Sequence, residues 1–287
     1  MKLQAQKVHR DGERRVALTR DSWRVRGELR PFVAGQTVQV RFFRNGRKIH
    51  EQTEQLRSIR GGRAGEFFTP FKSRKAGRVV VQAVHLATPE LDTARSERVR
   101  VNVEKPGVGS GVMVRLFQKG LAKLHFAVSR SGSYDDATAR AVMAYRKVNG
   151  MARTYSASES IVRRVLAGKG AFKAKYPEDG RHVEADMSRQ VLALINKRGK
   201  VYRVYHTSTG APATPTIIGK FRTYRKSPGT NAKGMVHSSY FIRGYAIHGY
   251  ASVPPYNASH GCLRVPIPNA WSIYEWVKMG TVVRVYP

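Results

Sequence analysis

The chain has 287 residues, 41% of them hydrophobic, which is enough for two or three domains with separate cores. It has no run of about 18 or more apolar residues, so no transmembrane segment is predicted. The chain has 52 Lys and Arg against 19 Asp and Glu, giving a formal net charge of +33. This charge favours polyanionic partners such as nucleic acid, acidic cell-wall polymer or an anionic membrane surface. The single cysteine excludes an internal disulfide.

Residues 1–105 are predicted to form an immunoglobulin-like β-sandwich. Apolar and polar residues alternate there in several short runs, which is typical of strands with one buried face. Asn45-Gly46 separates two such runs and predicts a hairpin turn. Trp23 is the only tryptophan of this region, and without cysteines the sandwich has no disulfide. No group of reactive side chains stands out, so we expect a spacer or docking module.

Residues 106–175 begin within a glycine-rich linker, KPGVGSG at 105–111, and are predicted to form a small bundle of three helices. Ser158 is the expected N-cap of the third helix. The runs VRLFQKGLAKL and TARAVMAYRKVNG, after Gly109-Ser110-Gly111, resemble the helical peptidoglycan-binding domain of many wall enzymes. The resemblance implies contact with glycan strands and stem peptides. A packing domain that only positions its neighbour is the alternative.

Residues 181–287 return to the alternation of strands. Gly199 is expected in a hairpin turn. IPNAWSIYEWVKMG is predicted to be a helix, because Pro268-Asn269 begins it and Gly280 follows it. This part of the chain is therefore a mostly β domain of its own.

The stretch AIHGYASVPPYNASHGCLRV, residues 246–265, is the candidate site. A thiol becomes a strong nucleophile when a neighbouring imidazole takes its proton, and Cys262 has His248 upstream at the end of an apolar strand. The turn Ser259-His260-Gly261-Cys262 contains a glycine, and such turns can direct successive amide groups at one point. Nucleophile, base and oxyanion donors can therefore come from one short segment.

Carboxylates are scarce in this part of the chain, with none between Asp186 and Glu275. A Cys-His-carboxylate triad would have to recruit Glu184, Asp186, Glu275 or a residue of another domain. A backbone carbonyl that holds the far nitrogen of His248 is the more economical arrangement. The same scarcity argues against a glycosidase with paired carboxylates and against a carboxylate metal site.

Two further interpretations of the cysteine segment remain open. Zinc could bind His248, His260 and Cys262, but a fourth protein ligand and the spacings of known zinc motifs are missing. Cys262 could instead be a buried, inert thiol beside two incidental histidines. The two histidines and two glycines around this cysteine favour a reactive site, and we expect no metal and no cofactor.

Residues 181–287 resemble the catalytic domain of the L,D-transpeptidases, the YkuD-type fold. The family motif is His-Gly at a strand end, a short loop, and then Ser/Thr-His-Gly-Cys followed by a hydrophobic residue and Arg or Asn. This chain has His248-Gly249 and then SHGCLR at 259–264. Upstream, STGAPATPTIIGKF and the hairpin before it also match in order. The chain is thus expected to be multi-domain and mainly β, ending in a mixed β-sandwich catalytic domain.

The resemblance implies roles for the motif residues. Cys262 would be the nucleophile and His248 its general base, with the carbonyl of Gly249 orienting the imidazole. His260 would support the turn and tune the thiolate. The amides of Gly261 and Cys262, together with that of His260, would hold the oxyanion.

The resemblance also suggests substrate contacts. Arg264 would hold a substrate carboxylate, or act as a structural clamp on the motif loop. Ser259 and Tyr240 are the other candidates, although Tyr240 could equally be a core residue. Residues 223–240 correspond to the family's substrate lid.

The implied reaction is attack by Cys262 on the third residue of a peptidoglycan tetrapeptide stem, with loss of the terminal D-alanine. An amine of a second stem then resolves the thioester into a 3→3 cross-link, whereas water would make the enzyme an L,D-carboxypeptidase. The partners would be stem peptides, glycan strands and anionic wall polymers, which also explains the basic charge.

Two non-enzymatic functions are the alternatives: a wall- or polyanion-binding protein with a decayed site, and a nucleic-acid-binding protein. No recognition motif supports nucleic acid. The expected location is outside the cytoplasm, in the cell wall or periplasm. Because the first residues, MKLQAQKVHRDGERR, lack the apolar stretch of a signal peptide, we expect that a leader has been removed.

Overall fold

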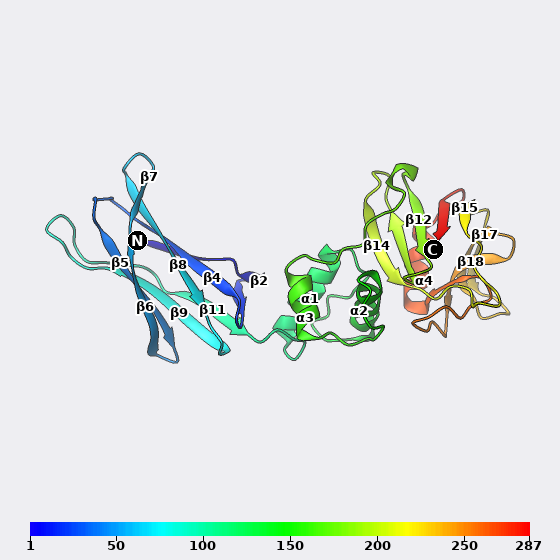
Figure 1. The fold of residues 1–287 in the computed structure, drawn as a ribbon, viewed down its shortest axis with the longest axis horizontal. Helices are drawn as coiled ribbons and strands as arrows, with labels where there is room; N and C mark the ends of the chain where they lie inside the picture. Colours follow the sequence, from blue (N-terminus) through cyan, green and yellow to red (C-terminus); the bar gives the residue numbers. More distant parts are fainter. The chain divides into compact units, whose positions relative to one another are not determined.

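The computed structural model describes residues 1–287, which form two compact units, Met1–Pro106 and Gly107–Pro287 (Figure 1). The division falls in the KPGVGSG segment. The chain is mainly β, with four α-helices, as predicted. None of its helices combines the length and the apolar character that a membrane span requires.

The first unit contains two β-sheets. One has the strand order β1-β4-β8-β7, and the other has the order β2-β3-β11-β9-β5-β6, with β10 paired to β9. The strands are β1 (Lys2–Gln6), β2 (His9–Asp11), β3 (Arg14–Leu18), β4 (Ser22–Leu29), β5 (Thr37–Arg44), β6 (Arg47–Gln55), β7 (Arg57–Ile59), β8 (Ala64–Lys72), β9 (Gly77–His85), β10 (Ala94–Arg95) and β11 (Val99–Glu104).

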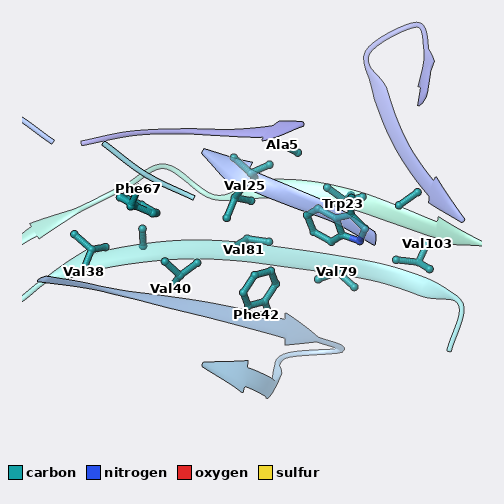
Figure 2. Close-up of a cluster of buried hydrophobic side chains, with 14 of the residues drawn as sticks. Ala5, Trp23, Val25, Val38, Val40, Phe42, Phe67, Val79, Val81 and Val103 are labelled. Carbon is teal, nitrogen blue, oxygen red and sulfur yellow. The ribbon is translucent and has the colours of Figure 1, made fainter. Parts of the chain in front are cut away.

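The two sheets share one hydrophobic core, because inward side chains of both belong to a single buried cluster (Figure 2). Trp23 is its largest member and meets the edges of Phe42 and Phe71, at ring-centroid distances of 6.1 and 5.4 Å. The Asn45-Gly46 hairpin is confirmed: both residues have positive φ, +50° and +76°, between β5 and β6. The immunoglobulin-like topology stays a prediction.

The second unit begins with three helices, α1 (Gly111–Lys123), α2 (Asp136–Val148) and α3 (Glu159–Leu166). Each has a capping side chain at its N-terminus. Ser158 accepts a hydrogen bond from the amide of Ile161, which confirms its expected role as the cap of α3. The likeness to a peptidoglycan-binding domain stays a prediction.

Two more sheets complete the second unit, with strand orders β14-β13-β12-β20-β15 and β16-β17-β18-β19. A buried cluster with members from both sheets and from α4 forms the core between them. The elements are η1 (Pro177–Asp179), β12 (His182–Asp186), β13 (Val191–Ile195), β14 (Val201–His206), β15 (Gly219–Arg222), β16 (Arg225–Thr230), β17 (Val236–Ile242), β18 (Tyr245–Tyr250), β19 (Leu263–Pro266), α4 (Ile267–Trp276) and β20 (Val282–Tyr286).

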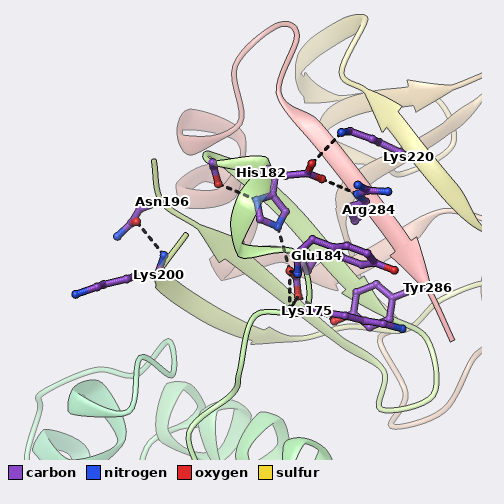
Figure 3. A network of polar contacts seen from close by, with 11 residues as sticks. Lys175, His182, Glu184, Asn196, Lys200, Lys220, Arg284 and Tyr286 are labelled. Atoms are coloured by element: carbon purple, nitrogen blue, oxygen red, sulfur yellow. Dashed lines mark hydrogen bonds and ion pairs between the residues drawn. The ribbon is translucent and has the colours of Figure 1, made fainter. Parts of the chain in front are cut away.

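A buried polar network joins β12 and β20, two neighbouring strands of the first of these sheets (Figure 3). Glu184 is fully buried on β12, where it pairs with the imidazole of His182 at 3.0 Å. It also accepts hydrogen bonds from the amides of Lys175 and Tyr176 and from the hydroxyl of Tyr286. Because its oxygens are bonded in this way, Glu184 anchors the segment that enters the sheet and is not a partner of His248.

Candidate active site

Strands β18 and β19 pair in parallel, and this pairing brings His248 and Cys262 together. Its register places His248 opposite Arg264 and Ile247 opposite Leu263. Ile247 and Leu263 belong to the core, so His248 and Arg264 face the other way. Cys262 lies two residues before Arg264, and this spacing puts it on the same face. His248, Cys262 and Arg264 all line one cavity of about 560 Å³.

The imidazole of His248 is held in a form that can act as a base. The side chain is buried, and its Nδ1 lies 2.9 Å from the carbonyl oxygen of Gly249. A carbonyl only accepts, so Nδ1 carries the hydrogen and Nε2 keeps its lone pair, an assignment that follows from the partner. Burial lowers the pKa of His248, the Arg264 charge adds to this, and the bond to Gly249 opposes it.

The thiol of Cys262 is protonated at rest. Burial raises its pKa, and the backbone at Ala246 and the charges of Arg264 and Lys233 offset only part of the shift. Its sulfur lies 3.9 Å from the carbonyl oxygen of Gly244, and no hydrogen bond joins it to the imidazole of His248. Catalytic hydrogen bonds are often long before substrate binds. The two pKa shifts therefore favour a neutral thiol and a neutral imidazole on one cavity wall.

A tight turn delivers Cys262 to this wall. Gly261 has φ +103°, and a Cβ there would lie 1.9 Å from Cε1 of Tyr245, so only glycine fits. The hydroxyl of Ser259 donates to the carbonyl oxygen of Cys262 at 2.6 Å and accepts from the amide of Gly261 at 3.1 Å. These two bonds close the turn from within.

Arg264 lines the same cavity and makes two further contacts. Its guanidinium carbon lies 4.3 Å above the ring of Tyr250, and Nη1 donates to the carbonyl oxygen of Ala258 at 3.2 Å. The ring of Tyr250 in turn meets His248 edge to face, at a centroid distance of 5.7 Å. Arg264 thus holds the loop before Cys262 while its guanidinium also lines the cavity.

A cysteine, a base-competent histidine and a turn of backbone amides on one pocket wall are the parts of an acyl-transfer site. Residues 180–285 match the family model of the YkuD L,D-transpeptidase catalytic domain. Residues 180–285 are therefore similar to an L,D-transpeptidase catalytic domain, and we refer to them as the L,D-transpeptidase domain.

Solved L,D-transpeptidase structures are among those similar to this chain. A crystal structure of an L,D-transpeptidase (residues 123–326) from Xylanimonas cellulosilytica is 28% identical, covers 62% of this chain and 94% of its own, and has a TM-score of 0.53. An L,D-transpeptidase from Stackebrandtia nassauensis is 19% identical, with a TM-score of 0.40, covering 64% of this chain and 98% of its own. Among curated protein sequences none matches the chain significantly.

Two residues of this turn with predicted roles already have hydrogen-bond partners inside the turn. The Gly261 amide already donates to Ser259, so it does not point freely at an oxyanion; the amides of Cys262 and His260 are the remaining candidates. Ser259 is buried, does not line the cavity and uses its hydroxyl to brace the turn, and its predicted contact with substrate stays a prediction.

The other predicted residues lie close to the cavity in different ways. His260 is exposed and lines it. Tyr240 is buried, in a cluster with Met235 and Ala246 against which Cys262 packs, so it lies behind the thiol and not on the wall. Tyr240 therefore lies in the core, which was the second of the two roles that the sequence allowed for it.

Several wall residues were missed by the sequence reasoning. Lys233 and Met235 come from the tip of the β16–β17 hairpin, inside the predicted lid segment, where no motif singled them out. Tyr245 and Tyr250 belong to the same strand as His248. Tyr250 stands two positions after His248, and strand periodicity alone could have placed it on this face.

The carboxylates that could have joined the site have other surroundings. Asp186 accepts bonds from Ser188 and from the amide of Arg189, and Glu275 is exposed on α4. No group of three or more His, Cys, Asp or Glu side chains is arranged to hold a metal ion. The orienting partner of His248 is therefore the Gly249 carbonyl.

Proposed function

We propose that this chain is a peptidoglycan L,D-transpeptidase that forms 3→3 cross-links through a thioester on Cys262. The family match over residues 180–285 and the likeness to the Xylanimonas enzyme support the class of reaction. The observation that carries the mechanism is the shared wall of the cavity, where a His248 ring fixed by Gly249 faces the same space as Cys262.

In the first step the sulfur of Cys262 attacks the carbonyl carbon of the third residue of a tetrapeptide stem. The thiol proton passes to Nε2 of His248, and the carbonyl oxygen takes the negative charge. The amides of Cys262 and His260 stabilise that oxyanion. As the tetrahedral intermediate collapses, the C–N bond breaks and the imidazolium returns its proton to the departing amine of D-alanine.

In the second step an amine of another stem attacks the thioester, and His248 accepts its proton. The new amide bond forms as the C–S bond breaks, and the sulfur recovers its proton. If water attacks instead, the product is a tripeptide and the activity is that of an L,D-carboxypeptidase. Whether an amine or water reaches the thioester decides between transpeptidase and carboxypeptidase activity.

The remainder of the chain is assigned to the wall. The helices α1–α3 would contact glycan strands and stem peptides, and residues 1–105 would act as a spacer or docking module. The formal net charge of +33 would retain the protein on anionic wall polymer. The proposed location is outside the cytoplasm, in the wall or periplasm.

The test is intact-mass spectrometry after addition of a carbapenem, a β-lactam class that acylates this family. We expect one adduct on the unaltered chain, none with Cys262→Ala, and slow formation with His248→Ala. Incubation with disaccharide-tetrapeptides should then give cross-linked dimers and free D-alanine, whereas tripeptide alone would assign the carboxypeptidase. A chain that forms no Cys262-dependent adduct and no product would be a binding protein.

A further inference from the structure

Lys147 is a buried cation of the helical segment that reaches into the L,D-transpeptidase domain. It lies in the last turn of α2, a helix labelled close to β14 in Figure 1, and its side chain is 2% exposed. Its Nζ lies 3.0 Å from the carbonyl oxygen of Gln190, 2.8 Å from that of Thr207 and 2.8 Å from Nδ1 of His206. None of these partners is a carboxylate, so three hydrogen bonds alone compensate the buried charge.

Counting hydrogens fixes the state of the pair. Nε2 of His206 lies 2.8 Å from the carbonyl oxygen of Val253, which can only accept, so Nε2 carries a hydrogen and Nδ1 accepts from Lys147. The carbonyls of Gln190 and Thr207 also only accept. The four bonds therefore need four hydrogens, which the pair has when it bears one positive charge. Burial lowers the pKa of Lys147 to about 6, and the charge of Arg153 adds to that shift. Burial and the charge of Lys147 lower the pKa of His206 to about 3, and the bond to Val253 opposes this shift. The hydrogen count nevertheless places one positive charge on the pair, because a neutral pair has only three hydrogens for the four bonds.

Two of the groups bonded to Lys147, His206 and Thr207, are themselves hydrogen-bonded to the segment that contains His248 and Cys262. Val253 lies in the loop between His248 and Cys262, so the His206 bond fixes that loop. Thr207 donates from Oγ1 to the carbonyl oxygen of Arg264 at 2.6 Å. The neighbouring Ser208 pairs with Arg264 through both backbone groups, each at 3.0 Å.

A third path runs through Gln190. Its side chain bonds the amide and the hydroxyl of Thr209, at 2.8 and 2.7 Å. The carbonyl oxygen of Thr209 accepts from the amide of Ser259 at 2.9 Å, and Ser259 braces the turn at Cys262. All three paths from Lys147 thus end within the segment that carries the nucleophile.

We infer that Lys147 is a positioning residue, through which the helical segment sets the place of Cys262 relative to His248. The inference rests on the proposed function. A role in stability alone explains the residue poorly, because a buried ion is costly and an apolar side chain of similar volume is often neutral or stabilising at such a site. A displacement of about 1 Å at the reacting atoms is enough to lower a rate about a hundredfold.

The experiment measures two rates on Lys147→Met, the closest unbranched apolar side chain. The first is acylation by a carbapenem, which depends on alignment of Cys262 with His248. The second is alkylation by iodoacetamide against pH, which reports only the thiol, because Cys262 is the single cysteine. We expect acylation to fall about tenfold to a hundredfold, while alkylation persists with its midpoint shifted down as the loosened loop admits water to the sulfur.

Matched variants separate positioning from folding. Val142→Ala removes a buried side chain from the same helix without touching the network, and it should lower the melting temperature while acylation of the folded protein stays unchanged. His206→Ala removes the path to Val253 together with one of the three partners of Lys147. It should reproduce part of the Lys147→Met effect and serves if that variant does not fold.

The outcomes distinguish the two proposals. Lys147→Met with the acylation rate and alkylation midpoint of the unaltered chain overturns the positioning role and leaves the proposed function intact. An unaltered chain without any adduct removes the proposed function. In that case the alkylation midpoint of Lys147→Met still decides whether this lysine shapes the environment of Cys262.

Discussion

Gly261→Ala should disable the L,D-transpeptidase domain while every side chain of the chemistry remains. The new Cβ would lie 1.9 Å from Cε1, 2.5 Å from Cδ1 and 2.8 Å from Cζ of Tyr245, distances that no pair of carbon atoms tolerates. The backbone at φ +103° is also strained for any other residue. Relief requires the turn to shift, and Cys262 is the next residue.

The loss of folding free energy in Gly261→Ala has two parts that can be measured separately. The positive φ contributes about 1–3 kcal/mol to the loss of stability. Overpacking against the ring contributes about 1–3 kcal/mol more. Tyr245→Ala removes all three contacted atoms and leaves the φ strain. In the Tyr245→Ala background, Gly261→Ala should therefore lower the free energy of unfolding by less than it does in the unaltered chain. The difference is the overpacking contribution, which a double-mutant cycle measures.

The assay is urea unfolding of the four proteins of the cycle, with carbapenem acylation as the functional readout. We expect at least a hundredfold loss of acylation in Gly261→Ala, on the order of what a misplaced nucleophile costs. Gly244→Ala is the matched control on the same cavity, because its φ is not positive and a Cβ there meets nothing within 4 Å. An equal cost of Gly261→Ala in both backgrounds would refute the steric reasoning.

Three other predictions concern the buried pair, the base and the guanidinium. Glu184→Gln leaves His182 without its charged partner in a fully buried site and should lower the free energy of unfolding by about 3–5 kcal/mol, whereas the exposed Glu275→Gln should stay within about 0.5 kcal/mol in the same urea titration. Because burial lowers the pKa of His248 below its ordinary 6.5, the neutral base persists into acid, and the acid limb of the acylation rate should lie below pH 6.5; a midpoint at or above that value would contradict the shift. Arg264→Met should lower kcat and the melting temperature with little change in KM, since the guanidinium holds the loop through Ala258; a rise in KM alone would instead assign it to a substrate carboxylate.

The sequence was most informative where the controlling interaction is local. Asn45-Gly46 determines its turn through its own dihedral angles, and Ser158 caps a helix three residues away. The orientation of His248 by Gly249 is of the same kind, because the two residues are neighbours in the chain. The spacing of His248 and Cys262 suggested one site, and the β18–β19 register supplies the shared face.

The sequence was least informative where a role depends on distant partners. Lys147 follows an arginine in an ordinary helical pattern and would be read as solvated, yet its three acceptors lie 43, 59 and 60 residues further along the chain. The Ser259 hydroxyl and the Gly261 amide are similar cases. Their bonding to each other follows from the closed turn, and a motif that records only residue types cannot show which amide is occupied.

Burial also changes how the nucleophile must work. Because the pKa of Cys262 is raised and that of His248 is lowered, these shifts favour the proton on sulfur before substrate binds. Proton transfer must then accompany attack, when the developing charge moves to the substrate oxygen instead of resting on sulfur. The proposed reaction consequently depends more on the backbone amides of the turn, which stabilise the oxyanion, than on a thiolate formed before substrate binds. This explains why displacing the turn should abolish acylation by a carbapenem while simple alkylation of the same thiol survives.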